Sequence, residues 1–382
     1  PEEDETDSLF SEIRSTQSDT QVAFRRGDRY AARLTRGRFS DGSSANRLDM
    51  PDSRIFHLDV VSPGLLDSLA LRPVPRGEPG PGEVEVRVFA TGLNFKDVLK
   101  ALGKYPIADS PLGDECAGVI SRVGEGVEGV QVGDRVAGMA SGSFRSYVIT
   151  RADLVVTLPD SVSLTQAAAL PIAYLTAEYS LNHLAKLSHA KSVLIHSAAG
   201  GVGMMAAQLA QRAGAEIFAT AGSPRKRALL RSLGVDHVMD SRTLDFADEI
   251  MRLTDDRGVD VILNSLAGDY IPKSLSVLTE RGSFLEIGRT DIWNADQVAA
   301  LRPDASYHPL YLGDVVDEDP GLIREMLVSL VRGLEAGTVE IPPHRVFPIE
   351  EAIDAFRFMG QSKHVGKIVL SQEETGKPRS DG

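Results

Sequence analysis

The chain has 382 residues, which exceeds one small core and suits two domains. Hydrophobic residues make up 42% and the formal net charge is -13, so we expect a packed interior and exclude nucleic acid as the main partner. No apolar run approaches the roughly 20 residues that span a bilayer, the N-terminal residues are acidic and polar, and Cys116 is the only cysteine; we therefore expect no membrane partner, no disulfide and a cytoplasmic location.

Two polar segments frame the chain. Residues 1–20 are rich in Asp, Glu, Ser and Thr and lack apolar periodicity, which predicts a linker, and residues 372–382 have the same character. Ordinary frayed termini are the alternative interpretation. Residues 21–157 show short strand patterns between Gly/Pro turns, as in the alternating stretch Glu83-Val-Glu-Val-Arg-Val-Phe-Ala. This pattern predicts a barrel-like β domain.

From residue 164 onward, strand and helix patterns alternate. The order is helix 164–187, strand 192–196, helix 203–213, strand 216–220, helix 226–233, strand 259–264, part of a helix at 274–278 and strand 283–287. Strands that alternate with helices predict an α/β fold with a doubly wound parallel sheet. A further helix from 320, strand 345–348, helix 349–359 and strand 366–370 close the chain.

A glycine-rich turn lies between the predicted strand 192–196 and the helix that follows it. It reads Ser197-Ala-Ala-Gly-Gly-Val-Gly, and its spacing matches a dinucleotide fingerprint with Ala in the first place. Gly200 would let the backbone approach a pyrophosphate, and Gly203 would let helix and strand pack closely. The candidate cofactor-binding residues of the turn are Ala198, Ala199, Gly200, Gly201, Val202 and Gly203. A purely structural turn is the alternative.

The residues after the next predicted strand indicate the cofactor. NAD enzymes carry Asp or Glu there to hold the ribose 2′-OH, whereas this chain has Ala221-Gly-Ser-Pro-Arg-Lys-Arg. Arg225, Lys226 and Arg227 stand where a 2′-phosphate would lie, and Ser241 and Arg242 could complete its cradle. Of this segment, Ser223 and Lys226 are the candidate cofactor-binding residues. The sequence therefore favours NADPH. Basic residues that merely solvate a helix face are the alternative.

Several further blocks occur in a fixed order. They are Thr91-Gly-Leu-Asn-Phe-Lys-Asp-Val-Leu, Gly113-Asp-Glu-Cys-Ala-Gly, Asn264-Ser-Leu-Ala-Gly, Phe284-Leu-Glu-Ile-Gly and Ala355-Phe-Arg-Phe-Met-Gly-Gln-Ser-Lys-His-Val-Gly-Lys. Together with the glycine turn, they resemble the enoyl-reductase domain of modular polyketide synthases and animal-type fatty acid synthase, in the zinc-free medium-chain dehydrogenase/reductase superfamily. The resemblance covers about residues 21–371.

The resemblance implies a GroES-like β-barrel substrate domain and a Rossmann domain. We expect the substrate domain at 21–172, the NADPH-binding Rossmann domain at 173–318, and a segment at 319–371 that completes the substrate domain. The implied reaction reduces the 2,3 double bond of a trans-2-enoyl thioester, plain or 2-methyl-branched, on an acyl carrier protein. The implied partners are the other domains of a multidomain synthase and a second copy of the chain, paired through a strand at 306–312.

The resemblance also bears on metals. Zinc members of the superfamily carry His in a Gly-His-Glu block, where this chain has Asp114, and they carry further cysteines. The chain has too few nitrogen and sulfur ligands at these positions to hold tetrahedral zinc, so we expect no metal. Cys116 is expected to pack as a small apolar residue.

Catalytic candidates follow by position. Tyr105, in the stretch after Asn-Phe-x-Asp, is the candidate proton donor to Cα; a tyrosine that only lines the substrate channel is the alternative. The family's proton-donor Lys is replaced by Arg289, which suits an anion clamp rather than an acid. Ungapped alignment puts Tyr311 at the family's Asp position, with Asp314 three residues on.

The family pattern places further residues near the cofactor. They are Asn94, Thr176, Asn264, Ser265 and Leu266. His196, inside a predicted strand, is expected to be a hydrogen-bonded core residue. Two other functions stay open: a free-standing NADPH quinone or enone reductase, and a non-catalytic NADPH-binding protein.

Overall fold

The structure, a computed structural model, describes residues 22–25, 28–31, 47–107 and 110–372. The predicted linkers lie outside these residues, apart from Gln372. The chain divides into two compact units, Pro1–Ala45 and Asn46–Gly382. The described part of the first unit is an antiparallel pair, β1 (Val22–Arg25) with β2 (Asp28–Ala31). All that follows concerns the second unit.

A six-stranded parallel sheet forms one half of the second unit. Its strands are β10 (Ser192–Ile195), β11 (Glu216–Ala221), β12 (His237–Asp240), β13 (Val259–Asn264), β14 (Leu278–Glu286) and β15 (Ser306–Pro309). They lie in the order β12-β11-β10-β13-β14-β15, and every neighbouring pair is parallel. This is the doubly wound Rossmann order, in which the direction of winding reverses between β10 and β13.

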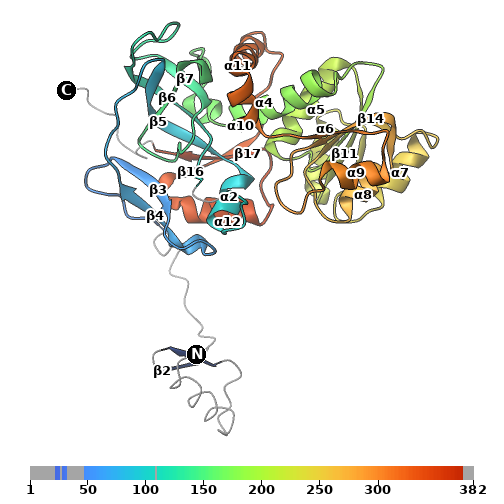
Figure 1. Cartoon of the computed structure of the whole chain (residues 1–382), viewed down its shortest axis with the longest axis horizontal. Helices are drawn as coiled ribbons and strands as arrows, with labels where there is room; N and C mark the ends of the chain where they lie inside the picture. The colour runs from blue at the N-terminus through green and yellow to red at the C-terminus, as the bar shows by residue number, and fades with distance from the viewer. Residues whose placement is uncertain (1–21, 26–27, 32–46, 108–109, 373–382) are drawn as a thin grey trace. The chain divides into compact units, whose positions relative to one another are not determined.

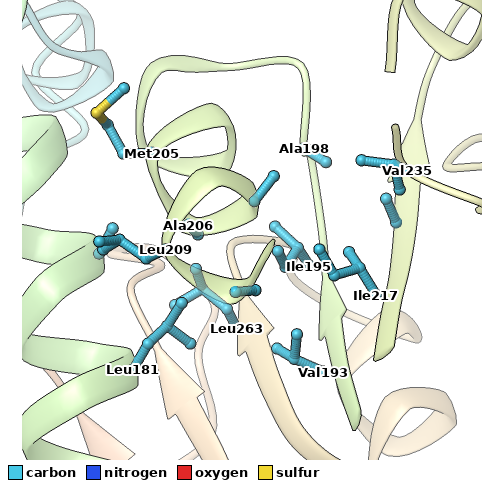
Figure 2. Close-up of a cluster of buried hydrophobic side chains, with 14 of the residues drawn as sticks. Leu181, Val193, Ile195, Ala198, Met205, Ala206, Leu209, Ile217, Val235 and Leu263 are labelled. Atoms are coloured by element: carbon cyan, nitrogen blue, oxygen red, sulfur yellow. The ribbon is translucent and has the colours of Figure 1, made fainter. Parts of the chain in front are cut away.

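Helices cover both faces of this sheet, since its strands alternate between two cores. Val193 and Ile195 pack with helix α5 on one face, whereas Leu194 joins Phe246 and Ile271 in a separate core on the other face. Figure 2 shows the first core, where Met205, Ala206 and Leu209 of α5 lie over the strands. The covering helices are α5 (Gly201–Ala213), α6 (Pro224–Ser232), α7 (Phe246–Leu253), α8 (Tyr270–Leu275) and α9 (Ala295–Leu301).

The second sheet joins residues from both ends of the unit. It has the order β16-β17-β5-β6-β7-β9, with β8 on β5. Figure 1 shows β16 and β17, from the end of the chain, beside β5. The strands are β5 (Glu83–Leu93), β6 (Glu115–Val123), β7 (Arg135–Met139), β8 (Tyr147–Arg151), β9 (Val155–Thr157), β16 (His344–Pro348) and β17 (Lys367–Ser371). A hairpin, β3 (Phe56–Val60) with β4 (Leu69–Pro73), lies nearby and shares a core with α12. The predicted combination of a GroES-like domain with a Rossmann sheet is confirmed.

The remaining helices connect or cover these sheets. They are η1 (Leu66–Ser68), α2 (Phe95–Ala101), η2 (Ala152–Leu154), α3 (Leu164–Ala167), α4 (Pro171–Glu178), η3 (Tyr179–Leu184), α10 (Leu312–Glu318), α11 (Pro320–Glu335), η4 (Ile349–Glu351) and α12 (Ala352–Gly360). The expected domain boundary at residues 172 and 173 lies within α4. No helix in the described ranges has the length and apolar character needed to cross a bilayer.

Two sequence predictions differ from the structure. The single helix predicted over 164–187 is interrupted after α3, because Pro171, which lacks an N–H, begins a new helix. The new helix, α4, continues directly into η3, which is π-helical. The helix predicted at 274–278 ends at Leu275, and Leu278 begins β14 instead, where it pairs with Val259 of β13. The apolar run there fits either element, so the pairing partner decides.

Candidate active site

The candidate site lies along the carboxyl edge of the parallel sheet. The glycine turn follows β10, Asn264 ends β13, Arg289 follows β14 and Tyr311 follows β15. Because all these strands run in one direction, their ends meet at one edge. Ligands of doubly wound sheets bind at this edge, where the winding reverses between β10 and β13.

The glycine turn is shaped by two close approaches. The N–H of Ala198 donates to the Thr220 carbonyl at 2.9 Å, which ties the turn to the end of β11. A Cβ on Gly203 would lie 2.5 Å from the Cα of Ala198, so helix α5 packs against the turn only with glycine there. A Cβ on Gly200 would meet only the Ser197 carbonyl oxygen, at 3.3 Å. A side chain at Gly203 would thus collide with backbone, whereas one at Gly200 would make a single tight contact. This is the arrangement expected of a dinucleotide-binding turn.

Basic side chains gather at the ends of β11 and β12. Ser223 caps α6 by accepting from the Lys226 N–H. Burial and the like charge of the neighbouring Arg242 lower the pKa of Lys226. Arg227 is engaged elsewhere, 2.8 Å from the Asp240 carboxylate, and Arg225 is exposed. Lys226 and Arg242 therefore remain as the converging cations.

The backbone of Ser241 is fixed beside them. Its N–H donates to the Ala221 carbonyl at 3.3 Å, and its carbonyl accepts from the Tyr270 hydroxyl at 3.0 Å. Both contacts hold the end of β12 next to the end of β11, so the predicted cradle residues Ser223, Lys226 and Ser241 stand on one corner of the sheet.

The C-terminal segment closes over the glycine turn. Gly366 bridges Gly200, and its N–H donates to the Ala199 carbonyl at 2.8 Å. The Lys226 ammonium donates to the Ser362 carbonyl at 2.8 Å. Residues of the segment that carries β17 thus contact both the turn and the basic corner.

His364 lies between these contacts. Its Nδ1 is buried and has no hydrogen-bond partner within the described ranges. Burial, with added repulsion from Lys226 and Lys367, lowers the pKa of His364 to about 4. This imidazole is therefore neutral and next to two cations.

A buried ion pair within the second sheet lies next to the glycine turn. Lys367 of β17 donates to the Glu115 carboxylate at 2.6 Å and to the Asn94 side chain at 2.7 Å. Asn94 in turn donates to Glu115 at 2.8 Å, and the other Glu115 oxygen accepts from the Ile172 N–H at the start of α4. Asn94, expected near the nicotinamide, thus has its side-chain groups engaged by this network. Thr176, also expected there, is buried in α4.

A second buried carboxylate orders the loops after β13 and β14. Glu286 accepts from the Asn264 side chain at 2.6 Å and from the Gly288 N–H at 2.6 Å. Burial raises the pKa of Glu286 to about 7, although the hydrogen bond from Asn264 acts against it. Asn264 also bonds both backbone groups of Leu266, so it shapes the loop. The Ser265 hydroxyl is buried without a partner among the residues that the structure describes.

The candidate catalytic residues from both domains meet in one cluster. The Arg289 guanidinium lies 4.6 Å from the Tyr311 ring centroid, and it donates to the Leu310 carbonyl. The Lys96 ammonium lies 5.2 Å from the same ring. Burial and the adjacent Tyr311 raise the pKa of Tyr105, whereas Lys96 and Arg289 act against this rise. The predicted Tyr105, Arg289 and Tyr311 are thus brought together.

Asp314 is not part of this cluster. It lies exposed in the first turn of α10, while Tyr311 precedes the same helix as its N-cap. Sequence reasoning also missed four charged residues of the site: Lys96, Glu115, Glu286 and Lys367. All four stand inside the sequence blocks quoted above, but only the long-range pairing of strands shows which of them face one another.

Two further predictions concern nearby core residues. Cys116 is buried in the core of the second sheet, and burial, with the negative charge of Glu115, raises the pKa of its thiol to about 12. His196 bonds Thr220 at 3.0 Å and Ser274 at 2.9 Å. Both are packing residues, as predicted. Among the described residues, no group of three or more His, Cys, Asp or Glu side chains has the geometry to hold a metal.

Comparisons with known proteins agree with this arrangement. Residues 80–160 match a family model described as the alcohol dehydrogenase GroES-like domain, and residues 233–370 match one described as zinc-binding dehydrogenase. The chain is 48% identical to the CurK enoyl reductase, with a TM-score of 0.79, over 99% of that protein and 83% of this chain. The chain belongs to the polyketide-synthase enoyl-reductase family of medium-chain dehydrogenases/reductases. It therefore has the fold of an oxidoreductase and binds a nicotinamide cofactor.

Other members of the family are also similar to this chain in sequence and structure. The JamJ enoyl reductase is 40% identical with a TM-score of 0.79, and the CurF ER cyclopropanase is 39% identical with a TM-score of 0.78; the chain covers 99% of each. Among curated proteins, a mycocerosic acid synthase-like polyketide synthase of Mycolicibacterium smegmatis is 41% identical over 97% of this chain. The chain spans 18% of the length of that polyketide synthase.

Proposed function

We propose that this enoyl-reductase domain uses NADPH to reduce the 2,3 double bond of a trans-2-enoyl thioester. The substrate is plain or 2-methyl-branched and is carried on an acyl carrier protein. The observation that carries the proposal is the cluster of Tyr105, Tyr311 and Arg289 at the carboxyl edge of the parallel sheet. A phenol can donate the proton to the enolate carbon, and a fixed cation can stabilise the enolate oxygen.

NADPH is the cofactor that the basic corner favours. The two cations Lys226 and Arg242 repel each other, so an anion between them would be stabilised. The end of β11 carries no acidic residue for a ribose 2′-OH, since Ala221, Gly222 and Ser223 stand there. A mycobacterial relative, 25% identical with a TM-score of 0.77, has been solved in complex with NADPH.

The cluster residues take separate roles in the mechanism. When bound, NADPH supplies the hydride that adds to Cβ of the enoyl group. As the electron pair moves to the thioester oxygen, Arg289 stabilises the enolate, because its guanidinium keeps its charge throughout. Tyr105 then donates its hydroxyl proton to Cα, and Tyr311 keeps Arg289 and Tyr105 in place by its ring and hydroxyl contacts. Asp314 is the second candidate for the proton donor, since it lies one helical turn from Tyr311.

The proposal extends to partners. The curated relatives are long polyketide synthases of which this chain spans a small part, which supports other synthase domains as neighbours in the natural protein. The acyl carrier protein would deliver the substrate to the cluster of Tyr105, Tyr311 and Arg289. We also propose a homodimer through β15, the last strand in the order of the parallel sheet.

Two other functions are tested by the same assay. A quinone oxidoreductase of Pseudomonas syringae is 29% identical with a TM-score of 0.76, so reduction of quinones has to be measured beside that of enoyl thioesters. A panel of enoyl thioesters of varied length and branching, with simple quinones as competitors, separates the two reductases. No NADPH oxidation with any substrate would favour a non-catalytic NADPH-binding protein.

The deciding experiment is single-turnover NADPH oxidation with a 2-methyl-enoyl thioester, paired with the configuration of the product. Arg289→Ala should slow hydride transfer by roughly 100- to 1,000-fold, because it removes a charge-assisted donor from the enolate oxygen. Tyr105→Phe should slow turnover by no more than about 100-fold and should scramble or invert the configuration at Cα. If Tyr105→Phe keeps both rate and configuration, the acid lies elsewhere, with Tyr311, Asp314 and water as candidates.

A further inference from the structure

Lys96 is one of the charged residues of the site that the proposed mechanism does not use. It stands in the first turn of α2, and its side chain is 18% exposed. Its ammonium lies 2.8 Å from the Asp114 carboxylate and 5.2 Å from the Tyr311 ring centroid. Removing a lysine ammonium from solvent costs free energy, and a functional role would explain why the lysine is kept there.

The Lys96 ammonium is fixed as a cation. Burial alone would lower its pKa, but the attraction of Asp114 outweighs burial and the pKa is raised. The Asp114 oxygen that does not face Lys96 is buried and has no hydrogen-bond partner in the part of the chain that the structure describes. Asp114, at the position where zinc relatives carry histidine, therefore serves here as the counter-ion of a lysine.

The other cations near Tyr105 are committed elsewhere. The Lys100 ammonium lies 5.8 Å from the Tyr105 ring centroid. It donates to the Pro111 carbonyl, however, and lies 3.9 Å from the buried Asp97 and 3.8 Å from Asp114. Burial lowers the pKa of Lys100, whereas the pKa of Lys96 is raised, so Lys96 is the more firmly charged of the two lysines. Arg289 donates to a backbone carbonyl and lies on the Tyr311 ring.

The charge of Lys96 also acts on Tyr105. Burial raises the pKa of the Tyr105 phenol, and Lys96 is the strongest group that acts against this, ahead of Arg289. A phenol that gives up its proton becomes an anion, and a nearby fixed cation stabilises that anion.

We propose that Lys96, anchored by Asp114, is a positioning residue that stabilises the Tyr105 phenolate formed in the reaction. This role rests on the proposed function. In the step concerned, the Tyr105 O–H bond breaks as a C–H bond forms at Cα of the enolate. The phenolate then takes a proton from water, so the phenol is restored and Lys96 keeps its own protons.

The first test measures the ionisation of Tyr105 and needs no turnover. The signal of Tyr105 is assigned in ¹³C-tyrosine-labelled protein by comparison with Tyr105→Phe, and it is followed against pH. In Lys96→Met the phenol should ionise at higher pH than in the wild type, while Lys96→Arg should stay near the wild type. Lys104→Met, an exposed lysine next to Tyr105, is the matched control and should leave the titration unchanged.

The second test measures coupling in turnover. Lys96→Met should lower kcat by up to about 100-fold with little change in KM, and Lys96→Arg should restore most of it. In the Tyr105→Phe background, Lys96→Met should add little further loss, because its effect acts through the phenol. Additive losses would mean that Lys96 supports the fold rather than Tyr105, and would overturn the proposal.

The outcomes separate this inference from the proposed function. An unchanged Tyr105 titration in Lys96→Met, in a chain that reduces enoyl thioesters, overturns the role of Lys96 alone. A wild-type chain that reduces no enoyl thioester overturns the proposed function and the role of Lys96 in the reaction, whatever the titration shows.

Discussion

In the proposed function, the choice of cofactor depends on single side chains at the ends of β11 and β12. The charge of Arg242 acts on Lys226. Arg225, one position before Lys226, is exposed on the same helix turn. A charge-assisted hydrogen bond to a phosphate contributes about 1.5–3 kcal/mol, or roughly ten- to a hundredfold in affinity. The two neighbouring basic residues therefore allow a matched comparison.

We predict that Lys226→Glu weakens NADPH binding by roughly ten- to a hundredfold and leaves NADH binding nearly unchanged, because only NADPH carries the 2′-phosphate. Arg225→Glu is the control and should affect both cofactors little. The measurement is a fluorescence titration of each variant with both cofactors. Equal affinity of the wild type for NADPH and NADH would contradict the cofactor assignment.

At the scale of elements, the glycine turn and helix α5 fit together by one close contact. A Cβ at Gly203 would collide with the Ala198 backbone, whereas a Cβ at Gly200 would meet only the Ser197 carbonyl oxygen. We therefore expect the two glycines to have separable roles, Gly203 in packing and Gly200 in binding the proposed cofactor.

Gly203→Ala should destabilise the fold by about 1–3 kcal/mol, because backbone has to shift to admit the methyl group. Gly200→Ala should keep nearly full stability and lose cofactor affinity, since its methyl group would occupy the space left for the pyrophosphate. Urea unfolding and cofactor titration of both variants check this pair. Equal loss of stability in the two would show that the turn has no such division of roles.

The pairing of β17 with β5 depends on a buried charge at its start. Lys367 is buried and its only carboxylate partner within 4 Å among the described residues is Glu115, which is fully buried. Breaking one partner of such a pair leaves an uncompensated charge, which costs about 3–5 kcal/mol.

Lys367→Met should therefore lower the free energy of unfolding by about 3 kcal/mol or more. The double variant Lys367→Met with Glu115→Gln should be less destabilised than the sum of the two single changes, because the stranded charge is gone. Lys363→Met, an exposed lysine of the same segment, is the control in urea unfolding. Strict additivity would contradict the coupling.

At the scale of the whole molecule, the parallel sheet ends in β15. An unpaired edge strand invites pairing with another chain, and a two-fold axis would extend the sheet across both copies. We predict a dimer by light scattering at micromolar concentration. Cys116 is buried, so Ser306→Cys at this edge would supply an accessible thiol that cross-links the copies, whereas Arg252→Cys on α7 should not. A monomer in solution would rule the proposed pairing out.

Local sequence determined the order of elements and the place of the cofactor turn. Apolar periodicity and the Gly-rich spacing act over a few residues, so the strands β10, β11 and β13 and the turn after β10 could be predicted from the sequence alone. The sequence blocks also indicated Tyr105, Arg289 and Tyr311, through resemblance to a family and not through any local pattern.

Only the tertiary structure decided which charges meet. Lys367 and Glu115 are 252 positions apart and touch because β17 returns to pair with β5, while α4 supplies the N–H that completes the site. The contact between Lys96 and Asp114 likewise joins the first turn of α2 to the residue just before β6. Periodicity cannot encode such pairs, because the free energy that selects them comes from burial shared by segments far apart in the chain.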